Sequence, residues 1–284
     1  MNVAVVGAGT MGHGIAQVAA LAGYETALTD TNVDALTAAA GRIQKNLDGG
    51  VERGKISAQD ARNALARLAM IEEMEAAVSG ADLVIEAVIE DLAVKRELFV
   101  RLDSSTLPSA ILATNTSSLS VTSIASVTKR PGRVLGMHFF NPVHIMKLVE
   151  LVRHEQTDSD VIERAREITI EMGKQPIVVT DSPGFVSSRL GVVLGLEAMR
   201  MVEQGVAKPE DIDKALELGY GHPMGPLKVS DLVGLDVRLA IAEYLHQELG
   251  QPHYEPPALL RDKVAAGELG KKTGKGFYEW PLNK

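Results

Sequence analysis

The first 17 residues of this 284-residue chain constrain its fold more than any other stretch. Val3 to Val6 form an unbroken apolar run rich in β-branched residues, as in a parallel strand that is buried on both faces. Three glycines follow with the spacing G-x-G-x-x-G, namely Gly7, Gly9 and Gly12, and a helical pattern runs from Met11 to Leu21. A strand, a glycine-rich turn and a helix in this order predict the phosphate-binding unit of a doubly wound α/β fold.

Each glycine has a physical role in such a unit. Gly7 permits the tight turn off the strand, Gly9 lets the backbone approach a pyrophosphate, and Gly12 lets the helix pack closely on the sheet. A second strand is expected over 25–29, and Asp30 ends it where a carboxylate meets the ribose hydroxyls of a dinucleotide. The alternative is a glycine-rich turn that binds no ligand.

Composition narrows the class of protein. The chain has no cysteine, which excludes disulfides, thiol catalysis and Cys-ligated metals. Its formal net charge of −8 argues against a nucleic-acid partner. No apolar stretch approaches the roughly 18 residues of a membrane-spanning helix, and Met1 leads into strand residues without a signal-peptide pattern. We therefore expect a cytoplasmic protein that binds neither membrane nor nucleic acid.

Strand and helix patterns alternate up to residue 180. Strands are expected over 68–71, 82–90, 111–113, 133–138, 147–152 and 175–180, and helices over 33–47, from a capping box at 57–60, and over 91–102, 121–125 and 160–172. Beyond the Pro-Gly boundary at 181–184 only helical patterns recur, over 185–204, 209–218 and 229–249. This order predicts a Rossmann-like doubly wound domain, residues 1–182, followed by an all-α domain, residues 183–284.

Several polar residues stand where these strands end. Glu86 and Glu90 lie towards the carboxyl end of the strand over 82–90, the end at which ligands bind in open α/β sheets. We interpret them as candidates for the cofactor side, although a surface or capping role fits either one equally well. Residues 114–120 are small and mostly hydroxyl-bearing, which is typical of a turn that ends in a helix N-cap.

The stretch after the second strand carries a local excess of positive charge. Six basic residues oppose three acidic ones between positions 42 and 67, with Arg53 and Lys55 between two expected helices. In an acidic protein this cluster fits a phosphorylated ligand, or else an ordinary solvated pair of helices.

His138 and Glu150 form the main catalytic candidate. The short loop that joins their two strands contains Pro142, so the two side chains fall within reach of each other. A carboxylate that holds an imidazole fixes its tautomer and stabilises the imidazolium, as in the usual construction of a general base. A histidine beside a strand is more often structural, so spacing alone leaves both interpretations open.

Short motifs run over nearly the whole chain. They are Ile-Glu-Ala-Val-Ile-Glu (85–90), Thr-Asn-Thr-Ser-Ser-Leu-Ser (114–120), His-Phe-Phe-Asn-Pro-Val (138–143), Lys-Leu-Val-Glu (147–150), Asp-Ser-Pro-Gly-Phe-Val (181–186), Pro-Met-Gly-Pro (223–226), Gly-Leu-Asp (234–236) and Gly-Lys-Lys-Thr-Gly-Lys-Gly-Phe-Tyr (270–278). With them the chain resembles the NAD-dependent L-3-hydroxyacyl-CoA dehydrogenases, in particular the short stand-alone bacterial 3-hydroxybutyryl-CoA type. The His-Phe-Phe-Asn-Pro stretch and the C-terminal motif are specific to this family, whereas the glycine motif is generic.

The resemblance implies a role for each matching position. His138 would be the catalytic base and Glu150 its orienting carboxylate, while Ser117 would hydrogen-bond the substrate oxygen. The phosphates of CoA would lie near Arg53 and Lys55. A substrate contact is also implied for Asn141, and a further one is in question at Ser188. The residues that would bind NAD are Gly7, Gly9, Thr10, Met11, Gly12, Asp30, Glu90, Lys95, Ser117, Asn141 and Lys272.

The resemblance also implies the reaction, the interconversion of (S)-3-hydroxyacyl-CoA and 3-ketoacyl-CoA in fatty acid metabolism, by hydride transfer and without a metal. The helical domain would close over the thioester and form the interface of a homodimer. One position departs from the family pattern: Ser188 stands before Arg189 where the family has Asn, which puts that substrate contact in doubt. Two alternatives stay open, a dehydrogenase of a non-CoA 3-hydroxy acid or sugar acid and a non-catalytic NAD-binding protein.

Overall fold

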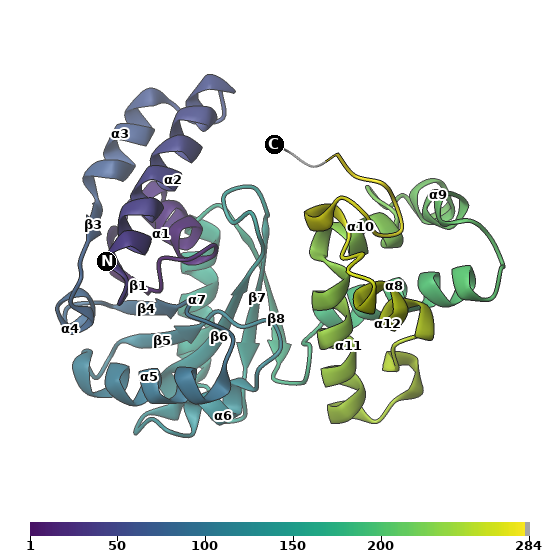
Figure 1. Cartoon of the computed structure of the whole chain (residues 1–284). Helices are drawn as coiled ribbons and strands as arrows, with labels where there is room; N and C mark the ends of the chain where they lie inside the picture. Colours follow the sequence, from purple (N-terminus) through teal and green to yellow (C-terminus); the bar gives the residue numbers. More distant parts are fainter. Residues whose placement is uncertain (282–284) are drawn as a thin grey trace. The chain divides into compact units, whose positions relative to one another are not determined.

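The structure is a computed structural model that describes residues 1–281. The chain divides into two compact units, Met1–Ser182 and Pro183–Lys284 (Figure 1). The first unit alternates strands and helices, and the second is helical. The predicted fold class, a doubly wound α/β domain followed by helices, is confirmed.

The first unit is built on one eight-stranded sheet with the order β3-β2-β1-β4-β5-β6-β7-β8. Its strands are β1 (Asn2–Val6), β2 (Glu25–Thr29), β3 (Leu68–Met70), β4 (Leu83–Glu86), β5 (Ile111–Thr114), β6 (Val134–Phe139), β7 (Leu148–Arg153) and β8 (Gln175–Thr180). Neighbours are parallel throughout, except that β7 runs antiparallel to β6. The strand order reverses between β1 and β4, the position at which open α/β sheets bind ligands.

Helices cover both faces of this sheet. Val3 and Val5 of β1 enter one core while Ala4 and Val6 enter the other, because successive strand side chains point to opposite faces. The first core is shared with α1 (Gly12–Leu21), α2 (Val33–Glu52), α3 (Ala58–Ala66) and α7 (Ser159–Glu171). The second is shared with α4 (Met74–Val78), α5 (Leu92–Ser105) and α6 (Val121–Ala125).

Two helix starts confirm their sequence signals. The capping box predicted at the start of α3 is present, since the side chains of Ser57 and Asp60 each accept from the backbone N–H of the other. Ser120 caps α6 through its hydroxyl, which accepts from the Ser123 N–H, as the hydroxyl-rich turn predicts.

Two boundaries in the first unit differ from prediction by four residues or more. The strand expected over 82–90 ends at Glu86, because the neighbouring strands β1 and β5 pair with it only as far as Val6 and Thr114. Helix α2 continues to Glu52 rather than ending at Leu47, since no residue after Leu47 stops the helical hydrogen bonds there.

The second unit consists of helices around one apolar core. They are α8 (Ser187–Glu203), α9 (Pro209–Tyr220), α10 (Pro226–Val233), α11 (Leu235–Leu249) and α12 (Ala258–Ala265). The helix expected over 229–249 is two helices, because Gly234 has a φ of 102° and interrupts the helical backbone. Helix α12 was not predicted, although a proline immediately precedes it and helices often begin after proline.

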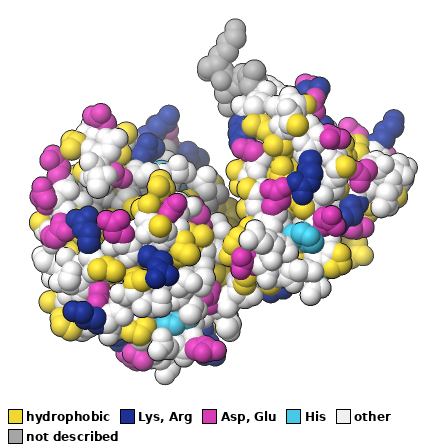
Figure 2. Space-filling view, turned by 60° about the horizontal axis from the view of Figure 1, so that its bottom comes forward, with side chains coloured by type: hydrophobic (Ala, Val, Ile, Leu, Met, Phe, Trp, Pro, Cys, Tyr) yellow, Lys and Arg dark blue, Asp and Glu magenta, His cyan; other side chains and the backbone are white. Residues whose placement is uncertain are grey.

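One face of the molecule is mixed in charge. Figure 2 shows acidic and basic side chains interspersed over the face that it draws, rather than gathered by sign. A nucleic-acid-binding surface gathers Lys and Arg on one face or along one helix. Within residues 1–281, no helix is both long and apolar enough to cross a bilayer.

Candidate active site

In the turn between β1 and α1, Gly7 and Gly12 pack closely against other backbone atoms, whereas Gly9 does not. Gly7 has a φ of 104°, and its amide donates to the Thr29 carbonyl across 2.8 Å. A Cβ on Gly12 would lie 1.7 Å from the Gly7 carbonyl oxygen, so α1 can begin this close to the strand only with glycine. A Cβ on Gly9, in contrast, would meet no atom within 4 Å. Backbone is therefore exposed to a ligand at Gly9.

A cavity of about 740 Å³ adjoins this turn at the carboxyl ends of β1, β2 and β4. Thr10, Met11 and Asp30 line it together with Gly7 and Gly9. The Asp30 carboxylate is held in place, because it accepts from the Ala8 N–H at 2.7 Å and from the Asn32 N–H at 2.9 Å. An open backbone turn and a fixed carboxylate in a cavity of this size fit the adenosine half of a dinucleotide.

The opposite wall of the cavity was missed in the sequence. It is formed by residues 72–75 and 87–89, which include Glu72 and Ile89. These segments follow β3 and β4, so the strand-end rule that identifies Asp30 applies to them as well. The apolar pattern of 87–89 was interpreted as a continuation of the strand and hid this signal.

His138 and Glu150 are direct partners in the antiparallel register of β6 and β7. Their side chains therefore leave the sheet on the same face, and the Nδ1 atom of His138 lies 2.7 Å from the Oε2 atom of Glu150. His138 is 7% exposed and Glu150 is fully buried. A carboxylate at this distance favours the tautomer with a proton on Nδ1 and stabilises the imidazolium. The contact that spacing left open is thus present.

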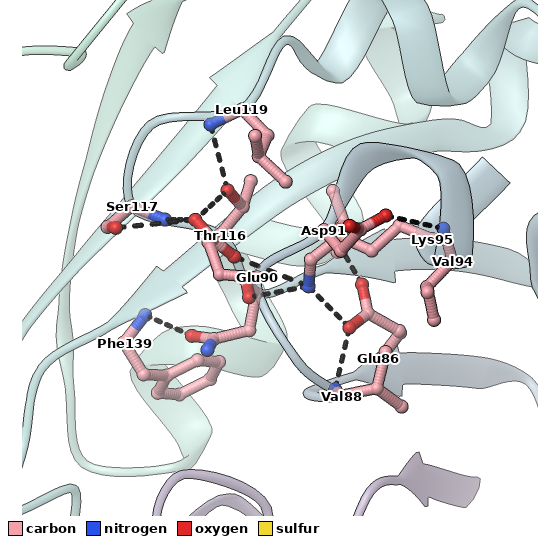
Figure 3. A network of polar contacts seen from close by, with 12 residues as sticks. Glu86, Val88, Glu90, Asp91, Val94, Lys95, Thr116, Ser117, Leu119 and Phe139 are labelled. Atoms are coloured by element: carbon pink, nitrogen blue, oxygen red, sulfur yellow. Dashed lines mark hydrogen bonds and ion pairs between the residues drawn. The ribbon is translucent and has the colours of Figure 1, made fainter. Parts of the chain in front are cut away.

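The loop after β5 is held through Glu90 (Figure 3). One oxygen of the Glu90 carboxylate accepts from the Ser117 N–H at 2.9 Å, from the Ser117 hydroxyl at 3.3 Å and from the Thr116 hydroxyl at 2.5 Å. Asn115, the first residue of the loop, accepts with Oδ1 from the Phe139 N–H of β6 at 2.9 Å. These contacts fix Ser117 between the segment after β4 and the strand that carries the histidine.

A buried ion pair lies beside this loop. Glu86 ends β4 and Lys95 belongs to α5, and the Nζ atom of Lys95 lies 2.5 Å from Oε1 of Glu86. Neither side chain has exposed surface. Burial raises the pKa of the Glu86 carboxyl, and the Lys95 ammonium opposes that shift. Glu86 points into the protein and does not line the cavity, which corrects its interpretation as a residue on the cofactor side.

The basic residues of α2 have different positions. Arg53 caps the C-terminal end of the helix, and it is exposed, as is Lys55. Arg42 instead turns towards the sheet and donates to the Ala8 carbonyl at 2.8 Å, so it ties α2 to the glycine turn. Asn141 is exposed in the loop between β6 and β7. Arg53, Lys55 and Asn141 lie outside the lining of the cavity and are open to solvent.

Two further expected site residues belong to the second unit. Ser188 is the second residue of α8. Lys272 lies in a short 3-10 helix, and its ammonium is 2.5 and 2.6 Å from the two carboxylate oxygens of Asp236. Partial burial opposes ionisation of Asp236, but hydrogen bonds from Lys272 and from the Val237 N–H keep its pKa below the ordinary value.

The chemistry that these residues offer is acid–base and binding chemistry. Within residues 1–281, no group of three or more His, Asp or Glu side chains could hold a metal ion. What the first unit provides is a nucleotide cavity, a histidine held by a carboxylate, and a serine fixed on a neighbouring loop. This combination suits proton transfer to or from a substrate beside a bound dinucleotide.

Comparisons with known proteins agree with this chemistry. Residues 2–182 match the family model of the 3-hydroxyacyl-CoA dehydrogenase NAD-binding domain, and residues 184–280 match that of its C-terminal domain. A 3-hydroxybutyryl-CoA dehydrogenase of Mycobacterium tuberculosis is 48% identical over 98% of both chains. A probable 3-hydroxybutyryl-CoA dehydrogenase of Bacillus subtilis is 46% identical over 98% of this chain and 97% of its own. A crystal structure of (S)-3-hydroxybutyryl-CoA dehydrogenase from Ralstonia eutropha has a TM-score of 0.95 at 40% identity and 99% coverage of both chains.

Proposed function

The chain belongs to the 3-hydroxyacyl-CoA dehydrogenase family, and from this premise we propose that it acts on (S)-3-hydroxybutyryl-CoA with His138 as general base. It is an NAD-dependent oxidoreductase of 3-hydroxyacyl-CoA. The four-carbon acyl group is proposed because the two relatives described above carry that substrate in their names. The matches of 40% identity or more described above name CoA thioesters, which favours a CoA substrate over the non-CoA and non-catalytic alternatives.

The observation that carries the proposed mechanism is the contact between Nδ1 of His138 and Oε2 of Glu150, at 2.7 Å. With Nδ1 engaged, Nε2 is the nitrogen that takes the proton of the 3-hydroxyl as the C3–H bond breaks. Bound NAD would supply the acceptor for the hydride of C3, so that the products are 3-ketoacyl-CoA, NADH and a protonated His138. Glu150 stabilises the imidazolium, and the same steps run backwards in reduction.

Ser117 supports this chemistry by positioning the substrate. Its backbone and hydroxyl both contact Glu90, and its loop is tied to β6 one residue after His138. We propose that the hydroxyl of Ser117 hydrogen-bonds the substrate oxygen, so that hydroxyl, base and nicotinamide are held in one geometry. Positioning of this kind lowers a barrier by removing the entropy of approach.

The ligands occupy neighbouring parts of the first unit in this account. The glycine turn with Thr10, Met11 and Asp30 holds the adenosine half of NAD, and Asn141 and Glu90 belong to its nicotinamide half. Arg53 and Lys55 are proposed to meet the phosphates of CoA, which is supported only by their exposure and charge.

We propose that the enzyme works in the cytoplasm, in fatty acid metabolism, as a homodimer formed through its helical unit. Large apolar side chains of that unit are open to solvent, with Leu218 84% and Tyr220 80% exposed on α9 and Leu190 61% exposed on α8. Large apolar side chains that are this exposed are available for contact with a second subunit. Light scattering of the purified protein tests the dimer.

Steady-state kinetics test the function itself. The enzyme should reduce acetoacetyl-CoA with NADH more efficiently than it reduces longer 3-ketoacyl-CoA thioesters. A higher kcat/KM for a long-chain substrate would contradict the four-carbon assignment and leave the dehydrogenase assignment intact. Free acetoacetate is the control, because it carries the same carbonyl without CoA.

A further inference from the structure

Glu86 and Lys95 form an ion pair that is closed off from solvent on both sides. Removing two charges from water costs several kcal/mol per ion, and the attraction between them rarely returns more than that. Such a pair contributes little net free energy to folding, but it can fix the positions of the groups around it.

Three oxygen atoms of the protein surround the Lys95 ammonium. It lies 2.5 Å from Oε1 of Glu86, 3.3 Å from the Asn115 carbonyl oxygen and 3.6 Å from Oε2 of Glu90 (Figure 3). An ammonium has three N–H donors, and here three oxygens face it. Lys95 is also 0% exposed, so the position of its ammonium is set by these neighbours.

Glu86 cannot turn away from Lys95, because its carboxylate is fixed from three directions. Oε1 accepts from the Val88 N–H at 2.7 Å as well as from Lys95, and Oε2 accepts from the Thr114 hydroxyl at 2.7 Å. The donors come from the segment after β4, from α5 and from β5. Glu86 therefore sets where the ammonium sits.

Glu90 is the group that connects this pair with the loop. Its Oε2 faces the Lys95 ammonium, while its Oε1 accepts from Thr116 and from Ser117. The Glu90 side chain is 39% exposed, so packing alone does not hold it. The Lys95 ammonium beside Oε2 therefore restrains the Glu90 carboxylate, whose Oε1 atom accepts hydrogen bonds from the loop.

We propose that Glu86 and Lys95 are positioning residues for catalysis. Glu86 fixes the Lys95 ammonium, and the ammonium holds the Glu90 carboxylate, which accepts hydrogen bonds from the Ser117 loop. The inference rests on the proposed role of Ser117 at the substrate oxygen. In Glu86→Gln the ammonium loses its main anionic partner and is drawn to Glu90. The Glu90 carboxylate then shifts towards Lys95, and its hydrogen bonds to Ser117 break. In Glu86→Gln/Lys95→Met no ammonium is left, and Glu90 is unrestrained.

The two variants separate positioning from stability. Breaking a buried pair by changing one partner is strongly destabilising, whereas replacing both partners with neutral side chains of similar size is often neutral. We expect Glu86→Gln to lower the melting temperature and the double variant to regain most of that loss. We expect kcat for acetoacetyl-CoA to stay at least about tenfold below the parent in both, since misplaced groups slow chemistry whether or not the fold is stable. The Kd for NADH, measured by fluorescence titration, should rise by a smaller factor than kcat falls, because the glycine turn and Asp30 still hold the adenosine half and only Glu90 and Lys95, at the nicotinamide half, are disturbed.

Asp103→Asn is the matched control. Asp103 lies on the same helix as Lys95 and forms a mostly buried pair with Arg130, at 2.9 Å and with side chains 9% and 14% exposed. This change should lower the melting temperature and leave kcat at the parental value. A double variant that regains both stability and kcat would reduce the Glu86–Lys95 pair to a structural role and overturn the proposal.

Amide hydrogen exchange gives a readout that does not depend on turnover. In both variants the peptide covering 115–120 should exchange faster than in the parent, while the C-terminal half of α5 exchanges at the parental rate, because local opening follows the loss of local contacts. Unchanged exchange at 115–120 would overturn the proposal even if activity fell. If the parent enzyme failed to reduce acetoacetyl-CoA, the proposed function would fall, and the exchange experiment would still decide whether the pair holds the loop.

Discussion

His138 and Glu150 lie opposite each other in the register of β6 and β7, with Nδ1 and Oε2 2.7 Å apart. The flanking register pairs, Met137–Leu151 and Phe139–Val149, are buried in the apolar core of the first unit. Because strand side chains alternate between faces, a slip of one residue would exchange the polar pair with an apolar one. Burial of the flanking pairs therefore fixes the alignment of base and carboxylate.

Cofactor choice follows from the surroundings of Asp30. Its carboxylate is fixed at the rim of the nucleotide cavity, its neighbours Thr29, Thr31 and Asn32 are uncharged, and Glu72 lines the same cavity. A 2′-phosphate would meet the negative charge of Asp30, and the residues next to Asp30 in the chain supply no arginine to bind it. We expect kcat/KM with NADH to exceed that with NADPH by at least about tenfold, or 1.4 kcal/mol. Equal efficiency with NADPH would show that Asp30 does not face the ribose, and Asp30→Ser should narrow the preference.

The CoA site is tested by reversing charge at the end of α2. Arg53→Glu/Lys55→Glu should raise KM for acetoacetyl-CoA by about threefold or more at low salt, since each exposed charge pair is worth up to about 1 kcal/mol. The increase should shrink with added salt, because screening acts over ~8–10 Å. Arg164→Glu/Arg166→Glu on α7 is the control with the same change in net charge. If KM responds equally to both double variants, or to neither, Arg53 and Lys55 do not contact CoA.

Ser188 is the one position where the chain departs from its family pattern. A serine hydroxyl is shorter than the asparagine amide, and a bridging water carries nearly the strength of a direct hydrogen bond. We expect Ser188→Ala to cost ~0.5–1.5 kcal/mol in kcat/KM, as for one ordinary hydrogen bond, and Ser188→Asn to be active. A loss in Ser188→Ala as large as in His138→Gln would make Ser188 a catalytic group.

The end of the helical unit is anchored by one buried carboxylate. Asp231 is 0% exposed and accepts from the Phe277 N–H, the Tyr278 N–H and the indole N–H of Trp280, at 3.0, 3.0 and 2.8 Å. Asp231→Ala leaves these donors without an acceptor and should cost about 2–4 kcal/mol in the free energy of unfolding. Trp280 is the single tryptophan, so its emission should shift to longer wavelength. Exposed Asp262, changed to Ala, is the control and should alter neither quantity.

Local patterns were sufficient to predict the layers of the fold. Alternating apolar runs and capping residues predict β1, the capping box of Ser57 and the cap at Ser120, because these depend on neighbours within a few residues. The break at Gly234 was missed, since a glycine within a helical pattern is usually tolerated and its positive φ is set by packing.

The site was predictable to the extent that strand ends and short loops define it. Asp30 follows from its place at the end of β2. Two strands joined by a short loop put His138 within reach of Glu150, but the spacing alone left their contact open. The burial of the Glu86 side chain was not predictable. The alternation of apolar and polar residues along a strand does not say which of several carboxylates at strand ends will pair with a lysine from a helix. The role of Lys95 depends on that same long-range pairing.

The most direct test of the account is the turnover of His138→Gln. Positioned proton transfer contributes typically 10²–10⁴-fold to rate, so kcat for acetoacetyl-CoA reduction should fall about 100-fold or more. NADH should bind as tightly as in the parent, because the cavity at the glycine turn is unchanged. A kcat within a few-fold of the parent would contradict the assignment of His138 as the general base.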